Sequence, residues 1–130
     1  MRILTFLLAL LAAPVVADDL DCSNAMTQQA MNQCAHASYE LADEELNRAY
    51  KLAVAQAREM DEYLQDGEEP AVTLLRDAQR AWIAFRDKAC EVDSLVVRGG
   101  SMQPLIYAGC LEQQTRARTE SLLAFAKGML

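Results

Sequence analysis

The strongest constraint on this 130-residue chain comes from its four cysteines, Cys22, Cys34, Cys90 and Cys110. They follow residues 1–17, which have the pattern of a cleavable export signal: Arg2 gives a positive start, residues 3–13 are almost entirely apolar, and small residues precede a cleavage point after Ala17. In an oxidising compartment an even set of cysteines forms disulfides. The sequence therefore predicts a periplasmic or secreted mature domain, residues 18–130, with two disulfides.

No membrane anchor is expected in the mature chain. The apolar run of residues 3–13 is about half of the ~20 residues that a helix needs to span a bilayer, and no later run approaches that length. A lipoprotein carries its cysteine directly after a small-residue cleavage box, whereas Cys22 follows Asp19, Leu20 and Asp21. The sequence thus predicts neither a membrane span nor a lipid attachment.

The charge balance narrows the choice of partner. The chain has 12 Lys and Arg against 19 Asp and Glu, a formal net charge of −7, and loss of the signal would remove the further positive charge of Arg2. An acidic domain is repelled by nucleic acid and by anionic membranes. The net negative charge favours a cationic protein partner, or it serves only to keep the protein soluble.

Glycine and proline divide the mature chain into three stretches. Both residue types are absent between Asp18 and Asp66, then cluster at residues 67–70 and 99–104. The first stretch has apolar residues at helical spacing and predicts one helix of about 40 residues. Its stripe comprises Leu46, Tyr50, Ala53, Ala57, Met60 and Leu64, extended backward by Met31, Cys34 and Leu41 or Ala42.

The other two stretches show a similar period. The second stripe comprises Val72, Leu75, Ala78, Trp82, Phe85, Ala89, Val92 and Val96, and the third comprises Leu105, Leu111, Leu122 and Phe125 together with Thr115 and Arg118. No period-two run of β-branched residues occurs. The predicted fold is all-α, an antiparallel three-helix bundle with a long first helix.

The hairpin between the second and third helices suggests how the cysteines pair. Cys90 and Cys110 flank one reversal and would face each other across it, which leaves Cys22 to pair with Cys34. Four cysteines allow three connectivities, and the sequence does not exclude the other two.

Motifs for enzymatic or metal chemistry are absent from the sequence. There is no CxxC or HExxH, the single histidine His36 has no second imidazole with which to share a metal, and Ser101 has no nucleophile-elbow sequence around it. The carboxylate runs are typical of solvated helix faces. We expect a non-enzymatic protein with no catalytic residue, no metal and no cofactor.

Two groups of residues remain as candidates for a structural or a binding role. Trp82 and Arg86 lie four apart on one helical face, where they can stack as a cation–π pair within the core. Arg118, on an inward stripe, is expected to be held by a carboxylate such as Asp43 or Asp87. These residues are predicted to be structural.

The second group is the reversal of residues 97–104. Its paired glycines, Gly99 and Gly100, permit backbone conformations closed to other residues, and a Cys90–Cys110 bridge would limit its entropy. It would then present Arg98 and Ser101 to a partner. Ser101 is alternatively the N-cap of the third helix.

Taken in order along the chain, several short motifs resemble a known family, the lysozyme-inhibitor LprI-like proteins, formerly classed as a domain of unknown function. The matching residues, which lie between Cys22 and about Leu123, are Met31–Ala35, Ala42-Asp43, Leu46-Asn47, Tyr50, Ala78–Trp82, Phe85–Asp87, Cys90, Gly99–Ser101, Cys110-Leu111, Thr115 and Arg118. The resemblance implies a helical, disulfide-bonded, exported protein. For the name-giving member, a lipoprotein, it also implies inhibition of lysozyme.

Two hypotheses for function follow. The first is a non-catalytic binding protein that inhibits lysozyme, or binds another cationic envelope or extracellular protein, through the reversal at residues 98–101. The second is a periplasmic structural or adaptor protein that docks on another envelope component through a helical face, with Tyr39, Tyr63 or Tyr107 as exposed anchors.

Overall fold

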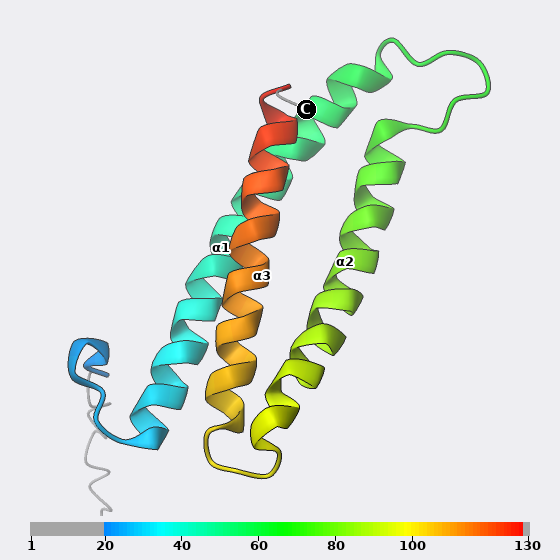
Figure 1. Cartoon of the computed structure of the whole chain (residues 1–130). Helices are drawn as coiled ribbons and strands as arrows, with labels where there is room; N and C mark the ends of the chain where they lie inside the picture. The colour runs from blue at the N-terminus through cyan, green and yellow to red at the C-terminus, as the bar shows by residue number, and fades with distance from the viewer. Residues whose placement is uncertain (1–19, 129–130) are drawn as a thin grey trace, which may run out of the picture.

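Three long helices make up the computed structural model, which describes residues 20–128 (Figure 1). Helix α1 spans Gln28–Asp61, α2 spans Ala71–Ser94 and α3 spans Gln103–Ala126, and the short 3-10 helices η1 and η2 span Cys22–Asn24 and Leu95–Val97. Residues 20–128 contain no strand, so the all-α prediction is confirmed. The predicted export signal and its cleavage point lie outside the described residues.

The core lies mainly between α1 and α3. These two helices run side by side and make the most extensive contacts, while α2 lies to one side of the pair (Figure 1). Small side chains dominate the buried positions, which lets the helices approach closely. The buried residues of α1 are Ala42, Leu46, Ala49, Ala53 and Ala57, and those of α3 are Ala108, Leu111, Thr115 and Leu122.

The apolar stripe predicted for the first helix is therefore buried in its middle, as expected, but not at its C-terminal end. Helix α1 ends at Asp61, and Met60 and Leu64 are 49% and 40% exposed. In Figure 1 the last turns of α1 continue past the end of α3 toward the start of α2. Met60 and Leu64 line an open hollow there with Ala71 and Leu74, so they are only partly covered.

Helix α2 buries a different face from the one predicted. Phe85, Val92 and Val96 are 65%, 64% and 80% exposed, whereas the residues that α2 buries include polar ones, Gln79, Arg86 and Ser94. The rotation follows from Cys90, which is bonded to α3 and lies about 140° around the helix from Phe85 at 100° per residue. Because Cys90 faces α3, Phe85 faces outward, and the predicted apolar stripe was wrong for this flank.

Both predicted disulfides are present. Cys22 is bonded to Cys34 and Cys90 to Cys110, each with a Cα–Cα distance of 5.5 Å. The first holds η1 against the start of α1, and the second closes the α2–α3 hairpin.

The reversal between α1 and α2 contains a helix cap that comes from the preceding helix. Pro70, the residue before α2, provides no side-chain cap. Instead, the carboxylate of Asp61 accepts hydrogen bonds from the backbone N–H groups of Ala71 (2.6 Å) and Val72 (3.2 Å). The last residue of α1 thus satisfies two otherwise unpaired donors at the start of α2.

Candidate functional site

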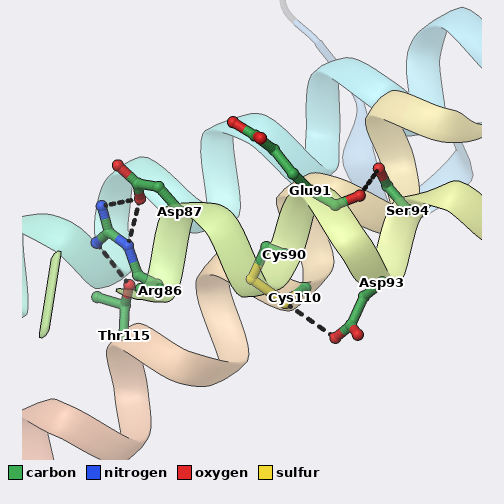
Figure 2. The surroundings of a disulfide bond; sticks show 8 residues. All are labelled: Arg86, Asp87, Cys90, Glu91, Asp93, Ser94, Cys110 and Thr115. Atoms are coloured by element: carbon green, nitrogen blue, oxygen red, sulfur yellow. Dashed lines mark hydrogen bonds and ion pairs between the residues drawn. A yellow bond between two sulfur atoms is a disulfide. The ribbon is translucent and has the colours of Figure 1, made fainter. Parts of the chain in front are cut away.

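The polar centre of the bundle is built around Arg86. Its guanidinium is almost fully buried, with Nη2 2.8 Å from Asp87 Oδ1 and Nη1 3.2 Å from Thr115 Oγ1 and 3.5 Å from Asp43 Oδ1. Asp43 belongs to α1, Asp87 to α2 and Thr115 to α3, so one side chain connects all three helices. Figure 2 shows the contacts with Asp87 and Thr115 beside the Cys90–Cys110 bridge.

Aromatic rings complete the surroundings of Arg86. The guanidinium carbon lies 5.0 Å from the centre of the Trp82 ring and 5.4 Å from that of Tyr39, so the predicted Trp82–Arg86 stacking is present. A buried guanidinium is tolerated when charge and hydrogen bonds satisfy it, and within residues 20–128 no buried polar side-chain atom lacks a partner. We read this cluster as structural.

Arg118 is held differently from the prediction. Its Nε donates to Gln79 Oε1 at 3.0 Å and its guanidinium carbon lies 5.9 Å from the Trp82 ring centre, while Asp43 and Asp87 contact Arg86 instead. Burial without an ionised partner lowers the pKa of Arg118. Trp82 is consequently partly buried, with arginines from two helices against it, rather than enclosed in an apolar core.

The α2–α3 reversal is a tight, internally bonded loop. Gly99 has φ +75°, a conformation that favours glycine, and its N–H donates to Gln103 Oε1 at 2.9 Å. The N–H of Gly100 donates to the carbonyl of Val97 at 2.9 Å. Gln103 also donates through Nε2 to Ser94 Oγ at 3.2 Å, so one amide ties the loop backbone to α2.

A second anchor comes from α1. Asn32 Nδ2 donates to the backbone carbonyl of Ser101 at 2.9 Å, across 69 positions of sequence. The residue that caps α3 is Met102, without a side-chain hydrogen bond, so the alternative role of Ser101 as a side-chain N-cap is wrong. Arg98 and Ser101 are both exposed, and within residues 20–128 Arg98 forms no ion pair.

Two hollows adjoin this loop. A shallow one of about 680 Å³ is lined by Glu91, Ser94, Gly99, Gly100, Gln103, Pro104 and Tyr107. A smaller one of about 330 Å³ is lined by Asn32, His36, Tyr39, Arg86, Asp87, Pro104, Tyr107, Ala108 and Leu111. Pro104 and Tyr107 border both, so the two hollows adjoin each other and the smaller one extends from the loop end of the bundle to the Arg86 cluster at its centre.

The tyrosines expected as exposed anchors differ among themselves. Tyr63 is 78% exposed, whereas Tyr39 and Tyr107 are partly buried at the loop end. Burial raises the pKa of both Tyr39 and Tyr107, and the charge of Arg86 partly opposes that rise. Their phenols therefore stay protonated at neutral pH and offer hydrogen-bond donors to a partner.

Asn32 and Gln103, which hold the loop in place, were not recognised from the sequence. Asn32 lies within the family motif Met31–Ala35 and Gln103 directly follows the paired glycines, but nothing in either motif indicates a hydrogen bond to the loop. Their role depends on α1 meeting the start of α3, which is a tertiary contact.

Within residues 20–128 no group of three or more His, Cys, Asp or Glu side chains could hold a metal ion, and no helix is long and apolar enough to cross a membrane. His36 Nδ1 lies 3.5 Å from Glu40 Oε1. Asp93 Oδ2 lies 3.4 Å from Cys110 Sγ, a contact rather than a hydrogen bond because a disulfide sulfur carries no proton.

Comparison with solved structures supports the fold. The chain is similar to a crystal structure of a DUF1311 family protein from Pseudomonas putida KT2440, with a TM-score of 0.65 and 24% identity, over 79% of this chain and 97% of that one. At this identity the likeness shows the shared helical fold alone.

Comparison of sequences identifies the family. The chain is 44% identical to the uncharacterized protein R02472 of Rhizobium meliloti (strain 1021) over 78% of this chain and 76% of that protein. It is 30% identical to the uncharacterized protein YecT of Escherichia coli (strain K12), over 71% of this chain and 60% of YecT. The pattern of the family described as "Lysozyme inhibitor LprI" matches residues 21–122. The chain therefore belongs to the LprI family.

Proposed function

We propose that this protein is an exported, non-catalytic inhibitor of lysozyme, and that the loop of residues 98–102 enters the sugar-binding cleft of its target. The observation that carries the proposal is the loop itself, a rigid projection whose one charged side chain, Arg98, is exposed and makes no ion pair within residues 20–128. Membership of the LprI family supports the choice of lysozyme as target.

The chemistry of the target explains why an arginine suits this task. Lysozymes hydrolyse glycosidic bonds with a pair of carboxyl groups that flank the bond in a cleft. A guanidinium pairs with a carboxylate through charge-assisted, often bidentate, hydrogen bonds. Arg98 on a narrow loop would therefore reach the catalytic carboxylates while the loop backbone blocks entry of the sugar.

Rigidity makes the loop an efficient plug. Ordering a flexible segment on binding costs free energy, whereas a segment already held in its bound conformation avoids much of that cost. Here Gln103, Asn32 and the Cys90–Cys110 bridge hold the loop from three directions.

The acidic surface would accelerate the encounter. Animal-type lysozymes are strongly basic, and a protein with a formal net charge of −7 is steered toward them, most strongly at low ionic strength. This attraction is long-range and contributes to the association rate more than to the choice of target.

A lysis assay tests the proposal. Purified residues 18–130 are expected to inhibit hen-type lysozyme on bacterial cell walls, and the double variant Arg98→Ala, Ser101→Ala is expected to lose inhibition while melting at the same temperature. Arg58→Ala, which removes an exposed arginine from the last turn of α1, serves as the matched control and should inhibit fully. Full inhibition by the loop variant would exclude the loop as the binding element.

A further inference from the structure

One face of α2 and η2 carries an apolar stripe that the bundle leaves uncovered. The stripe consists of Leu74, Ala78, Ala81, Phe85, Val92 and Val96, all of them exposed. Their spacings of three, four and seven residues place them on one side of the helix. At 1.5 Å per residue the stripe is about 33 Å long.

The stripe carries no charge of its own. Two residues of opposite sign border it on the same flank, Asp77 toward one end and Lys88 toward the other. Each is paired within its own helix, Asp77 with Arg76 at 2.9 Å and Lys88 with Glu91 at 2.8 Å. The protein is acidic overall, but the stripe carries no charge. A second copy of the protein would therefore meet little electrostatic repulsion at this face.

We propose that the stripe is a self-association surface, on which α2 packs antiparallel against α2 of a second copy about a two-fold axis. In this register the Phe85 ring rests on the partner's Ala81. Val92 then meets the partner's Leu74, and Lys88 comes opposite the partner's Asp77. Large side chains thus lie against small ones in the middle, and the border charges meet with opposite sign.

The orientation follows from the same residues. A parallel pairing about a two-fold axis would place Phe85 against Phe85 at the centre and would carry the Asp77 and Lys88 side chains of the two copies to opposite flanks, so the bulky rings would oppose each other and the border charges would not pair. An antiparallel two-fold pairing is equally self-complementary, offsets the rings and keeps the border charges of both copies on one flank. The charge pattern therefore selects the antiparallel form.

The area suits a reversible dimer. The exposed fractions of Leu74, Phe85, Val92 and Val96 are 53%, 65%, 64% and 80%. These side chains present roughly 500 Å² of apolar surface, about the apolar share of an interface that buries ~800 Å² on each partner. We expect a homodimer that forms at micromolar concentration rather than an obligate one.

The pairing is compatible with lysozyme binding but does not depend on it. Antiparallel helices point their ends in opposite directions, so the two loops of residues 98–102 would lie at opposite ends of the dimer. One dimer would then present two loops.

Sedimentation equilibrium of residues 18–130 over a range from micromolar to millimolar concentration tests the proposal. A reversible monomer–dimer equilibrium is expected for the unmodified protein. Phe85→Glu should weaken it at least ~tenfold, because it places a charge at the centre of each stripe. Leu52→Glu is the matched control: Leu52 is 56% exposed on α1, away from the stripe, and its substitution should leave the equilibrium unchanged. Phe85 is exposed, so both variants should melt near the temperature of the unmodified protein.

Charge reversal tests the orientation. Asp77→Lys alone and Lys88→Asp alone should each weaken the dimer, and the double variant should restore it. A parallel dimer would not be weakened by the single reversals. A protein that stays monomeric at every concentration, or a dimer that Phe85→Glu leaves unchanged, would overturn the proposal.

Discussion

Arg86 and Trp82, one turn apart on α2, lie with the guanidinium carbon 5.0 Å from the ring centre, and the same guanidinium contacts Asp43 on α1 and Thr115 on α3. The bundle is therefore held at its centre by a cation, while the small apolar core lies farther along α1 and α3. Stacking against a ring and pairing with carboxylates both stabilise a guanidinium removed from water.

Arg86→Ala should lower the free energy of unfolding by about 3 kcal/mol, the lower end for breaking a buried ion pair. The lower end applies because Asp43 and Asp87 are 39% and 42% exposed and keep access to water when the cation is removed. Urea denaturation followed by circular dichroism measures the loss. Arg80→Ala, at an exposed position of the same helix, should change stability little; equal stability of the two variants would contradict a structural role for Arg86.

Trp82→Ala should lower the free energy of unfolding by about 3 kcal/mol, toward the lower end for a tryptophan because the ring is only partly buried. Since Trp82 is the one tryptophan of the chain, unfolding must be followed by circular dichroism rather than by fluorescence. Lysozyme inhibition should persist at temperatures where the variant is folded. Lost inhibition at unchanged stability would instead make Trp82 a recognition residue.

Features fixed by local sequence could be predicted. The glycine and proline clusters located both reversals, the helical spacing of Trp82 and Arg86 gave their stacking, and the position of Cys90 and Cys110 on either side of one turn gave the disulfide pairing. Each depends on residues close in sequence or on a single hairpin.

Features that depend on how the helices pack against each other could not be predicted from the sequence. The apolar stripe of α2 is a regular helical pattern, yet the bundle buries Gln79 and Arg86 and leaves Phe85 exposed, because Cys90 and Arg86 bond to α3 and set the rotation. For the same reason, the sequence-based prediction paired Arg118 with Asp43 or Asp87, whereas in the structure both carboxylates contact Arg86. A hydrophobic pattern shows which face is apolar, but only the tertiary contacts decide whether that face is covered.

The Cys90–Cys110 bridge should matter more for stability than the Cys22–Cys34 bridge. The double variant Cys90→Ser, Cys110→Ser should lose about 3 kcal/mol, as expected for opening a loop with a sequence separation of 20. Cys22→Ser, Cys34→Ser should lose less, since η1 contributes no buried residue. Thermal denaturation compares the two. Peptide mapping of the unmodified mature protein without reductant should find both bridges and no free thiol.

Asp61→Ala should lower stability by about 1 kcal/mol, the typical cost of losing a helix N-cap acceptor. The loss should be local, because the carboxylate bonds the N–H groups of Ala71 and Val72. Amide hydrogen exchange is expected to accelerate at those two positions before the rest of α2. Asp66→Ala removes an exposed carboxylate of the same reversal and is the control; similar exchange in both variants would mean that Asp61 does not cap α2.

Loosening the loop should weaken inhibition even when Arg98 is untouched. Gln103→Ala removes the amide that bonds both Gly99 and Ser94, and Asn32→Ala removes the bond to the Ser101 carbonyl. Neither change removes the charge that we assign to the target's carboxylates. The free loop would then sample more conformations, and binding would have to supply the cost of ordering it. We expect the double variant to inhibit lysozyme several-fold less strongly, roughly the loss of 1 kcal/mol of binding free energy, with a small change in melting temperature.

A double-mutant cycle separates this effect from general damage. In the background of Arg98→Ala, where the main contact is already lost, the two loosening substitutions should have little further effect, because a loop that no longer binds gains nothing from being rigid. Inhibition constants of the four proteins, measured with one lysozyme preparation, give the coupling. Purely additive losses would mean that Asn32 and Gln103 act independently of Arg98, and the binding surface would then have to lie elsewhere on the bundle.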